Sequence, residues 1–347
     1  MKSGIALAHS EKKRLQDLLD SFQKVRVLVV GDFILDQFIW GSVDRISPEA
    51  PVPVVHVQRE SYMPGGSLNV GNNIRALHGI VYPCGVVGRD REGRMLVRLI
   101  RREKIETTGI VYATDRPTCV KTRVIAHSQQ VVRFDREKTH DLAPELKRKI
   151  FQFVQKSISS VDVVLIEDYG KGVIQPRLLK QIIDLSQKHR KPVLVDPKEK
   201  HFSYYAGATV ITPNRKEAFQ AYSNDRGEDK NISVEDVGKD LMKRLNLKAV
   251  LITLGEDGMA LFEKGKSMVT IPTAAREVYD VSGAGDTVIA VLSMAMAAGA
   301  SMKEASIIAN LAAGIVVGKL GTAVVTFKEL RQAIENCPGT RNLKRKR

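Results

Sequence analysis

Short runs of Val, Ile and Leu recur along the chain, and each run ends in glycine or polar residues. The runs lie in segments 25–32, 161–172, 191–198, 208–217 and 248–258. Their continuous apolar character predicts strands that are buried on both faces, as in a parallel sheet. Apolar residues at helical spacing in 176–189 and 233–246 predict helices between these strands. This alternation predicts an α/β fold with a doubly wound, mostly parallel sheet flanked by helices.

Two other regions have a different pattern. Residues 37–62 and 111–135 alternate between apolar and polar positions and are rich in Val and Thr, without long helices between them. This pattern predicts a few antiparallel strands that project from the α/β body as a small β lid or a dimerisation surface. We therefore expect an N-terminal helix within 1–24, one domain over 25–335 that includes this lid, and a basic tail over 336–347.

The composition is that of an ordinary globular protein, because 43% of the 347 residues are hydrophobic. The longest apolar stretches are too short or too interrupted by glycine to span a bilayer, and the N-terminus has no signal-peptide pattern. We expect a cytoplasmic protein without a membrane partner. Cys84, Cys119 and Cys337 have no spacing typical of zinc ligands, which argues against a metal cluster and structural disulfides.

The net charge of +15 raises the question of a nucleic-acid partner. Lys and Arg are spread along the chain, however, and the dense run RNLKRKR at 341–347 has no aromatic residues among its charges. A solvated tail explains this run better than a nucleic-acid arm does. The excess charge also fits ligands that carry phosphate, so we expect no nucleic acid.

Polar residues at the strand ends are the first candidates for chemistry, because ligands of α/β sheets bind outside the carboxyl ends of strands. Asp32 and Asp36 follow the first strand and could accept hydrogen bonds from sugar hydroxyls, or act as helix caps. Gly65 and Gly66 would let a ligand approach the backbone, and the amide of Asn69 could bind a polyol. A plain turn that caps a helix is the alternative for this segment.

The segment TPNRKEA places Asn214 and Glu217 three residues apart after another strand. On one helical face these side chains could hold hydrated Mg²⁺ near a triphosphate, but the same spacing also suits a capping box. Thr253, Gly255 and Gly258 form a tight turn after a strand, which would suit a loop near nucleotide phosphates.

The stretch DVSGAGD, residues 280–286, begins an apolar helical segment. A helix that starts here exposes backbone N–H groups, and the small residues Gly283, Ala284 and Gly285 would let a phosphate come close. Asp286 could then take a proton from a hydroxyl that attacks the phosphate, while Asp280 supports the loop. No GxxxxGK[ST] motif is present, so this is not a Walker A loop.

Taken together, the motifs GD at 31–32, GGSLN, TPNRKE, TLGEDG and DVSGAGD resemble those of the ribokinase-like (PfkB) carbohydrate kinases over about residues 25–330. DVSGAGD matches that family's signature DTxGAGD except at Val281. The resemblance implies ATP and Mg²⁺ as cofactors, Asp286 as the catalytic base and residues 283–285 as an anion hole. It also implies that Asn214 and Glu217 are the Mg²⁺ motif, acting through water.

Three further segments, 44–57, 167–173 and 195–217, are similar to the heptose 7-phosphate kinases of the ADP-heptose pathway. This resemblance implies transfer of phosphate to the anomeric 1-hydroxyl of D-glycero-D-manno-heptose 7-phosphate. It further implies a stand-alone kinase with a separate adenylyltransferase downstream. Such a substrate needs residues that bind its phosphate and hydroxyls, and the remaining candidates are Arg45, Arg123, Arg133, Asp168, Lys171 and Lys198.

Three alternatives stay open at this point. The first is a ribokinase-like enzyme for another sugar or a nucleoside. The second is a catalytically silent sugar- or nucleotide-binding regulator, against which the joint presence of Asp280, Asp286, Asn214 and Glu217 argues. The third is nucleic-acid binding, which would give a strongly salt-dependent gel shift. We also expect a homodimer through the lid, because unpaired strand edges are usually covered.

Overall fold

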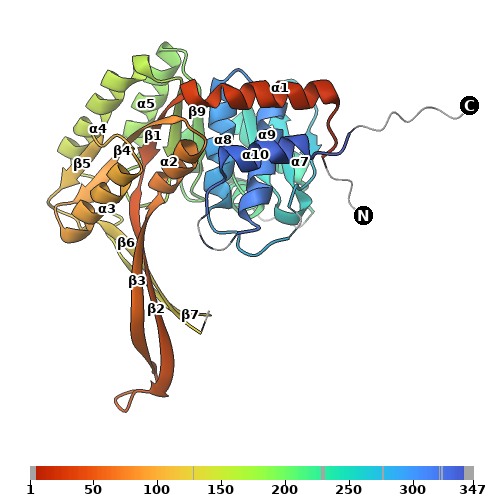
Figure 1. Ribbon diagram of the computed structural model, residues 1–347. Helices are drawn as coiled ribbons and strands as arrows, with labels where there is room; N and C mark the ends of the chain where they lie inside the picture. Colours follow the sequence, from red (N-terminus) through yellow and green to blue (C-terminus); the bar gives the residue numbers. More distant parts are fainter. Residues whose placement is uncertain are drawn as a thin grey trace, which may run out of the picture.

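The computed structural model describes residues 5–127, 129–227, 231–275, 277–319, 321 and 323–339. In this described part, the main sheet has nine strands in the order β13-β12-β11-β10-β9-β8-β1-β4-β5 (Figure 1). Neighbouring strands pair in parallel from β11 through β10, β9, β8, β1 and β4 to β5. The pairs β11-β12 and β12-β13 are antiparallel. The bounds are β1 Arg26–Gly31, β4 Ile80–Gly88, β5 Ile110–Ala113, β8 Val163–Glu167, β9 Val193–Asp196, β10 Val210–Ile211, β11 Ala249–Thr253, β12 Met259–Glu263 and β13 Val269–Ile271.

Helices cover both faces of this sheet. Alternate residues of each strand point to opposite sides, and because both sets are apolar, both faces need a covering layer. On β1, Val27 and Val29 belong to one hydrophobic core, while Leu28 and Val30 belong to the other. The first core is completed by α1 His9–Asp20, α2 Ser67–Ala76, α3 Arg91–Arg102, α8 Ala284–Ala297, α9 Met302–Val316 and α10 Phe327–Glu335. The second is completed by α4 Pro144–Ser157, α5 Pro176–Lys188, α6 Arg215–Arg226 and α7 Val234–Arg244. The predicted doubly wound α/β architecture is confirmed.

A second, small sheet extends from the body as a long arm (Figure 1). Its strands, in the order β3-β2-β6-β7, are β2 Phe33–Ile46, β3 Pro53–Gly66, β6 Cys119–Ala126 and β7 Gln129–Arg136. The two hairpins β2-β3 and β6-β7 are antiparallel, and a parallel pairing of β2 with β6 joins them. The second predicted lid segment, 111–135, begins too early, because residues 110–113 form β5 of the main sheet.

The order of the strands puts a switch point between β1 and β8. From β1 the chain continues to β4 and β5 on one side, whereas β8, β9, β10 and β11 follow on the other. In open α/β sheets, ligands bind in the crevice outside the carboxyl ends of the strands at such a point. The small sheet starts beside the same place, because β2 follows β1 after a single residue.

The ends of the described chain lie together, since the N–H of Leu7 donates to the carbonyl of Pro338 at 2.8 Å. Most of the predicted basic tail, from residue 340 on, lies outside the described residues. No helix in the described ranges is both long and apolar enough to cross a bilayer.

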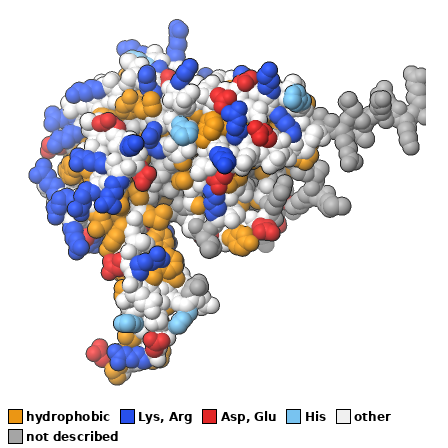
Figure 2. Space-filling model, viewed as in Figure 1, with side chains coloured by type: hydrophobic (Ala, Val, Ile, Leu, Met, Phe, Trp, Pro, Cys, Tyr) orange, Lys and Arg blue, Asp and Glu red, His pale blue; other side chains and the backbone are white. Residues whose placement is uncertain are grey.

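Lys and Arg side chains gather over one side of the body (Figure 2). The exposed arginines of α3 contribute to this surface: Arg91, Arg94, Arg98, Arg101 and Arg102. Their spacing puts them on the side of α3 opposite its buried Leu96 and Ile100. The folded protein therefore concentrates positive charge more than the spread of Lys and Arg along the chain predicts.

Candidate active site

Helix α8 begins at the switch point with a glycine in a left-handed conformation. Gly283 has φ 78°, a backbone region that favours glycine. The N–H of Ala284 donates to the carbonyl of Val281 at 3.2 Å, so this residue uses its donor within the turn. The N–H groups of Gly285 and Asp286 come next in the first turn, where a helix lacks its own acceptors. These two amides are therefore the donors that the helix start offers to an anion.

Gly285 keeps the space in front of these amides open, and Asp280 holds the loop that precedes them. A Cβ atom at Gly285 would meet only the Oδ2 atom of Asp196, at 3.9 Å, so the missing side chain leaves room for a ligand. Asp280 accepts hydrogen bonds from the N–H groups of Ser282 at 2.8 Å and Gly321 at 3.1 Å. Asp280 thus holds the preceding loop, in the supporting role expected for it.

Asp286 is buried in the first turn of α8 and is bound on both carboxylate oxygens. Asn69 donates from Nδ2 to Oδ2 at 2.6 Å, and the hydroxyl of Tyr169 donates to Oδ1 at 2.7 Å. Asn69 lies in the first turn of α2, which follows Gly66 with its φ of 60°. Burial raises the pKa of Asp286, and the two hydrogen bonds oppose this rise. The structure thus brings together Asn69 and Asp286, two candidates that are far apart in the sequence.

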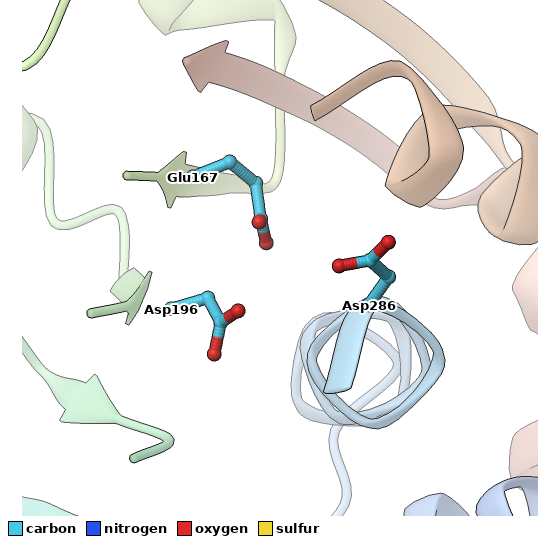
Figure 3. A group of neighbouring side chains, drawn as sticks. All are labelled: Glu167, Asp196 and Asp286. Atoms are coloured by element: carbon cyan, nitrogen blue, oxygen red, sulfur yellow. The ribbon is translucent and has the colours of Figure 1, made fainter. Parts of the chain in front are cut away.

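Three carboxylates face one another across the crevice, as Figure 3 shows for Glu167, Asp196 and Asp286. One oxygen from each lies within 4.8 Å of the others. Asp196 accepts a hydrogen bond from the hydroxyl of Thr212 at 3.0 Å, while neither carboxylate oxygen of the buried Glu167 has a partner among the described residues. Burial raises the pKa values of Glu167 and Asp196 well above their ordinary range. Such clustered oxygens fit a divalent cation of the Mg²⁺ type.

Asp32 shapes the loop that follows β8. Its carboxylate accepts hydrogen bonds from the backbone N–H groups of Tyr169, Lys171 and Val173, each at 3.0 Å. Burial raises the pKa of Asp32 to about 6, against the opposing effect of these donors. A carboxylate with three protein donors has little capacity left for a ligand. The structure therefore gives Asp32 a loop-building position rather than the sugar contact expected from the sequence.

Asp168 is similarly engaged by the protein. Its carboxylate accepts hydrogen bonds from the N–H of Gly170 at 2.8 Å and the hydroxyl of Tyr205 at 2.8 Å, and it lies 2.7 Å from Nδ1 of His201. The bond to Asp168 raises the pKa of His201. Asp168 thus connects β8 to the segment after β9 and shapes the turn at Gly170, while its predicted contact with the sugar stays a prediction.

The root of the small sheet brings charged side chains to the crevice. Asp36 on β2 forms an ion pair with Arg123 on β6. A side chain at Gly65 would collide with the Asp36 carboxylate, which explains the need for glycine there. Lys121, also on β6, is partly buried, with its Nζ atom 5.2 Å from the centroid of the Tyr169 ring. Burial lowers the pKa of Lys121.

Asn214 and Glu217 form the capping box that was the alternative interpretation of their spacing. The N–H of Glu217 donates to Oδ1 of Asn214, and the N–H of Asn214 donates to Oε2 of Glu217, both at 2.9 Å. Glu217 nevertheless lies close enough to Asp196 to raise its pKa. The pair therefore caps α6 at the edge of the carboxylate cluster, where a capping role and a water-mediated metal contact are compatible.

A cavity of about 1210 Å³ opens beside this edge. Gly255 and Gly258, with φ values of 63° and 86°, delimit the turn η4 that follows β11 and Thr253. The two residues between these glycines contribute to the lining of the cavity, together with residues from the segment after β13, from α9 and from α10. Lining residues include Glu256, Asp257, Thr273, Ala275, Gly314 and Gln332. The cavity is large enough for a nucleotide.

The predicted phosphate-binding lysines lie at the crevice but have acidic partners. Nζ of Lys171 lies 2.6 Å from Glu137, and Nζ of Lys198 lies 3.0 Å from Glu199. Lys198 also flanks Gly170 in the loop after β8. Both lysines remain near the strand ends where an acceptor would bind.

Arg45 is not brought to the crevice. It is exposed near the tip of the β2-β3 hairpin, opposite Val54 and about 30 Å along the strand from Asp36. Arg133 lies opposite Arg123 in the small sheet, but its exposed side chain bonds to Asp135. Neither arginine is positioned in this structure as a contact for a substrate phosphate.

Sequence reasoning missed four side chains of this site: Tyr169, Lys121, Glu167 and Asp196. Glu167 and Asp196 had a usable signal, because each is the last residue of a buried strand at the ligand-binding edge. Tyr169 and Lys121 had no such signal, since Tyr169 contacts Asp286 across 117 residues of sequence and Lys121 contacts the ring of Tyr169 from another strand.

The site combines a glycine-led helix start, a buried carboxylate and clustered carboxylates at the switch point of an α/β sheet. These are the parts that phosphoryl transfer needs: donors for an anion, a proton acceptor and oxygen ligands for a divalent cation. Residues 24–328 match the family model described as pfkB family carbohydrate kinase. The chain belongs to this family of carbohydrate kinases.

Curated relatives agree with this assignment. "Bifunctional protein HldE" of Geobacter sulfurreducens is 44% identical over 320 residues, covering 92% of this chain and 65% of the relative. The protein of the same name from Helicobacter pylori strain J99 is 43% identical over 305 residues, covering 88% of this chain and 65% of the relative. The chain thus spans about 65% of the length of these relatives.

Solved structures share the fold. The ribokinase of Thermotoga maritima aligns with a TM-score of 0.69 at 22% identity, over 90% of this chain and 100% of that chain. Phosphofructokinase-2 of Escherichia coli, in complex with potassium, aligns with a TM-score of 0.73 at 18% identity, over 90% and 98% of the two chains. The predicted ribokinase-like fold is confirmed.

Proposed function

We propose that this kinase transfers the γ-phosphoryl group of ATP to the anomeric 1-hydroxyl of D-glycero-D-manno-heptose 7-phosphate. The product would be the 1,7-bisphosphate, a precursor in ADP-heptose and lipopolysaccharide biosynthesis. Support for the substrate comes from segments 44–57, 167–173 and 195–217 and from the relatives named HldE. The observation that carries the chemistry is the buried Asp286 beside the donors of the α8 N-terminus. We expect an adenylyltransferase activity to act downstream of this kinase reaction.

In the proposed reaction, Asp286 accepts the proton of the anomeric hydroxyl. The hydroxyl oxygen forms a bond to the γ-phosphorus while the bond from this phosphorus to the β–γ bridging oxygen breaks, and ADP leaves. The N–H groups of Gly285 and Asp286 stabilise the charge on the γ-phosphoryl oxygens. Glu167, Asp196 and Glu217 would hold Mg²⁺, which neutralises phosphate charge when bound.

The remaining parts of the ligands have candidate contacts of matching chemistry. Arg123, Lys171 and Lys198 supply positive charge at the crevice for the phosphate of the acceptor. The cavity of about 1210 Å³ beside η4 would take the nucleoside of ATP. With the nucleoside in this cavity, the phosphates of ATP would extend past the carboxylate cluster to Asp286.

Replacement of the proposed base tests the reaction directly. Asp286→Asn keeps the shape of the side chain but removes its ability to accept a proton, so we expect kcat to fall by about 10²–10⁴-fold with ATP binding retained. A coupled ATP-consumption assay with heptose 7-phosphate measures the rate. Asp184→Asn, on the exposed face of α5, is the matched control and should keep the wild-type rate.

A substrate panel tests the acceptor separately. Heptose 7-phosphate should give the highest kcat/KM among phosphorylated and unphosphorylated sugars. Activity with ribose or fructose, but none with heptose 7-phosphate, would reject the proposed substrate. The assignment of the protein as a sugar kinase would stand. A near-normal rate for Asp286→Asn would reject Asp286 as the base.

A further inference from the structure

The carboxylate of Asp286 is held from two sides by different elements. Tyr169, in the loop after β8, donates to Oδ1 at 2.7 Å, and Asn69, in α2, donates to Oδ2 at 2.6 Å. Rotation of an aspartate carboxylate about its last torsion is otherwise poorly restricted, because this torsion has broad minima. Two donors on opposite oxygens therefore define the plane of the carboxylate. One lone pair on each oxygen remains for a reacting hydroxyl.

Tyr169 is itself restrained at three points. Its backbone N–H donates to Oδ2 of the buried Asp32 at 3.0 Å, and its hydroxyl donates to Asp286. The ammonium group of Lys121 lies 5.2 Å from the centroid of its ring, within the range of a cation–π interaction. Tyr169 is thus held at its backbone N–H, at the face of its ring and at its hydroxyl, and each contact comes from a different part of the fold.

The two donors to Asp286 have different surroundings. The carbonyl of Asn69 accepts a bond from Nδ2 of Asn73 at 3.0 Å, and Oδ1 of Asn73 accepts one from the hydroxyl of Thr287 at 3.0 Å. Asn69 is therefore part of the packing between α2 and α8. Tyr169 belongs instead to the acceptor side of the crevice, two residues from Lys171, and its ring touches a side chain of the small sheet.

We propose that Tyr169 is a positioning residue for the proton transfer. Its hydroxyl, fixed by Asp32 and Lys121, keeps the Asp286 carboxylate in the orientation in which a free lone pair faces the acceptor hydroxyl. Lys121 acts through the ring of Tyr169. This inference rests on the proposed role of Asp286 as the base. It adds a residue from outside the helix start to the catalytic arrangement.

Tyr169→Phe removes the hydroxyl and keeps the ring, its contact with Lys121 and the backbone bond to Asp32. We expect kcat to fall by about 10–100-fold, because small misplacements of a reacting group have effects of this size. KM for ATP and for the sugar phosphate should stay within about twofold, since no interaction with either ligand is lost. Tyr222→Phe, on α6, is the control for loss of a phenol hydroxyl and should leave both parameters unchanged.

Variants of Lys121 test whether its contact with the ring of Tyr169 supports the proton transfer. Lys121→Met should lower kcat less than Tyr169→Phe does, and Lys121→Arg should restore most of the rate because it keeps a cation over the ring. The double variant should be no slower than Tyr169→Phe alone, since Lys121 acts only through the hydroxyl that is already missing. A rise in KM for the sugar phosphate in Lys121→Met would show a direct substrate contact and overturn this link.

The outcomes separate this inference from the proposed function. If Asp286→Asn is inactive while Tyr169→Phe keeps its full kcat, Asp286 remains the base and the positioning role of Tyr169 is rejected. If Asp286→Asn stays active, the proposed reaction itself is wrong. A loss of kcat in Tyr169→Phe counts only when urea unfolding gives the wild-type free energy, and a fall in stability that accounts for the loss would overturn the proposal. The assay works with any acceptor that the wild-type enzyme phosphorylates.

Discussion

At the scale of single residues, the site depends on buried carboxylates with unequal numbers of partners. Asp32 has three backbone donors, whereas Glu167 has none among the described residues although it is 0% exposed. A buried carboxylate without donors is costly when ionised. Asp32 is therefore satisfied by the fold itself, while Glu167 depends on a ligand or a proton. The ionisation of Glu167 should therefore lower the stability of the fold.

Glu167→Gln tests this difference through the pH dependence of stability. Because burial raises the pKa of Glu167 in the folded protein, its favourable contribution is present at low pH and is lost as pH rises through the folded pKa. Glutamine cannot ionise, so the variant should gain stability relative to wild type between pH 5 and pH 8. The difference in unfolding free energy between the variant and the wild type should increase by about 1–3 kcal/mol from pH 5 to pH 8.

Urea denaturation at both pH values, with a chelator present, measures the difference in unfolding free energy between Glu167→Gln and the wild type. Addition of Mg²⁺ should narrow it at pH 8 by stabilising the wild-type protein, because a bound cation replaces the missing donors. A difference between variant and wild type that is the same at both pH values would contradict an ionising Glu167.

At the scale of elements, the start of α8 combines a left-handed glycine with the proposed anion site. Gly283 adopts φ 78°, and the two amides proposed to bind phosphate follow within three residues. The other end of the same helix is followed by Gly299, with φ 89° and no heavy atom within 4 Å of an added Cβ. One helix thus has a left-handed glycine at the active site and another away from it.

Gly283→Ala and Gly299→Ala are therefore a matched pair. Both should lower the free energy of unfolding by about 1–2 kcal/mol, the cost of a left-handed conformation for an L-residue. Gly283→Ala should also lower kcat by at least about tenfold, because it distorts the turn that presents the amides of Gly285 and Asp286. Gly299→Ala should keep the wild-type kcat. Equal kcat values for the two variants would argue against a functional anion site at the start of α8.

At the scale of the whole molecule, the small sheet exposes hydrophobic side chains, which Figure 2 shows mainly where the arm leaves the body. Val132 and Phe134 on β7 are 49% and 53% exposed. Strand alternation puts them on the face opposite Lys121 and Arg123, which point to the crevice. A sheet with one face toward the site and an apolar face in solvent suits the proposed dimer through this sheet.

Phe134→Glu should shift this dimer to monomers. Burying a phenylalanine contributes about 1.5–3 kcal/mol, and a symmetric interface loses this amount twice, so we expect at least about a 10²-fold rise in the dimer dissociation constant. Light scattering after size exclusion measures the mass over a range of concentrations. Tyr112→Glu, at an exposed aromatic residue on β5 of the main sheet, is the control and should leave the mass unchanged. A monomeric wild-type protein would reject the interface.

Much of the fold was predictable because its signals are local. The five predicted strands all occur side by side in the main sheet, as β11, β10, β9, β8 and β1. Strand β4 was missed because Pro83, Cys84 and Gly85 interrupt its apolar run, and the antiparallel strands β12 and β13 were missed as well. Cross-strand pairing supports these segments in ways that single-strand composition does not reveal.

The sequence alone determined the α/β class, the glycine-led helix start and Asp286 within it, because hydrophobic period, turn chemistry and motif spacing act over a few residues. The tertiary structure decided which polar groups meet: it engaged Asp32 and Asp168 in loop contacts, kept Arg45 near the tip of the small sheet, and brought Tyr169 and Lys121 to Asp286. The physical reason is that hydrogen bonds and burial depend on packing between distant elements, which local sequence does not specify.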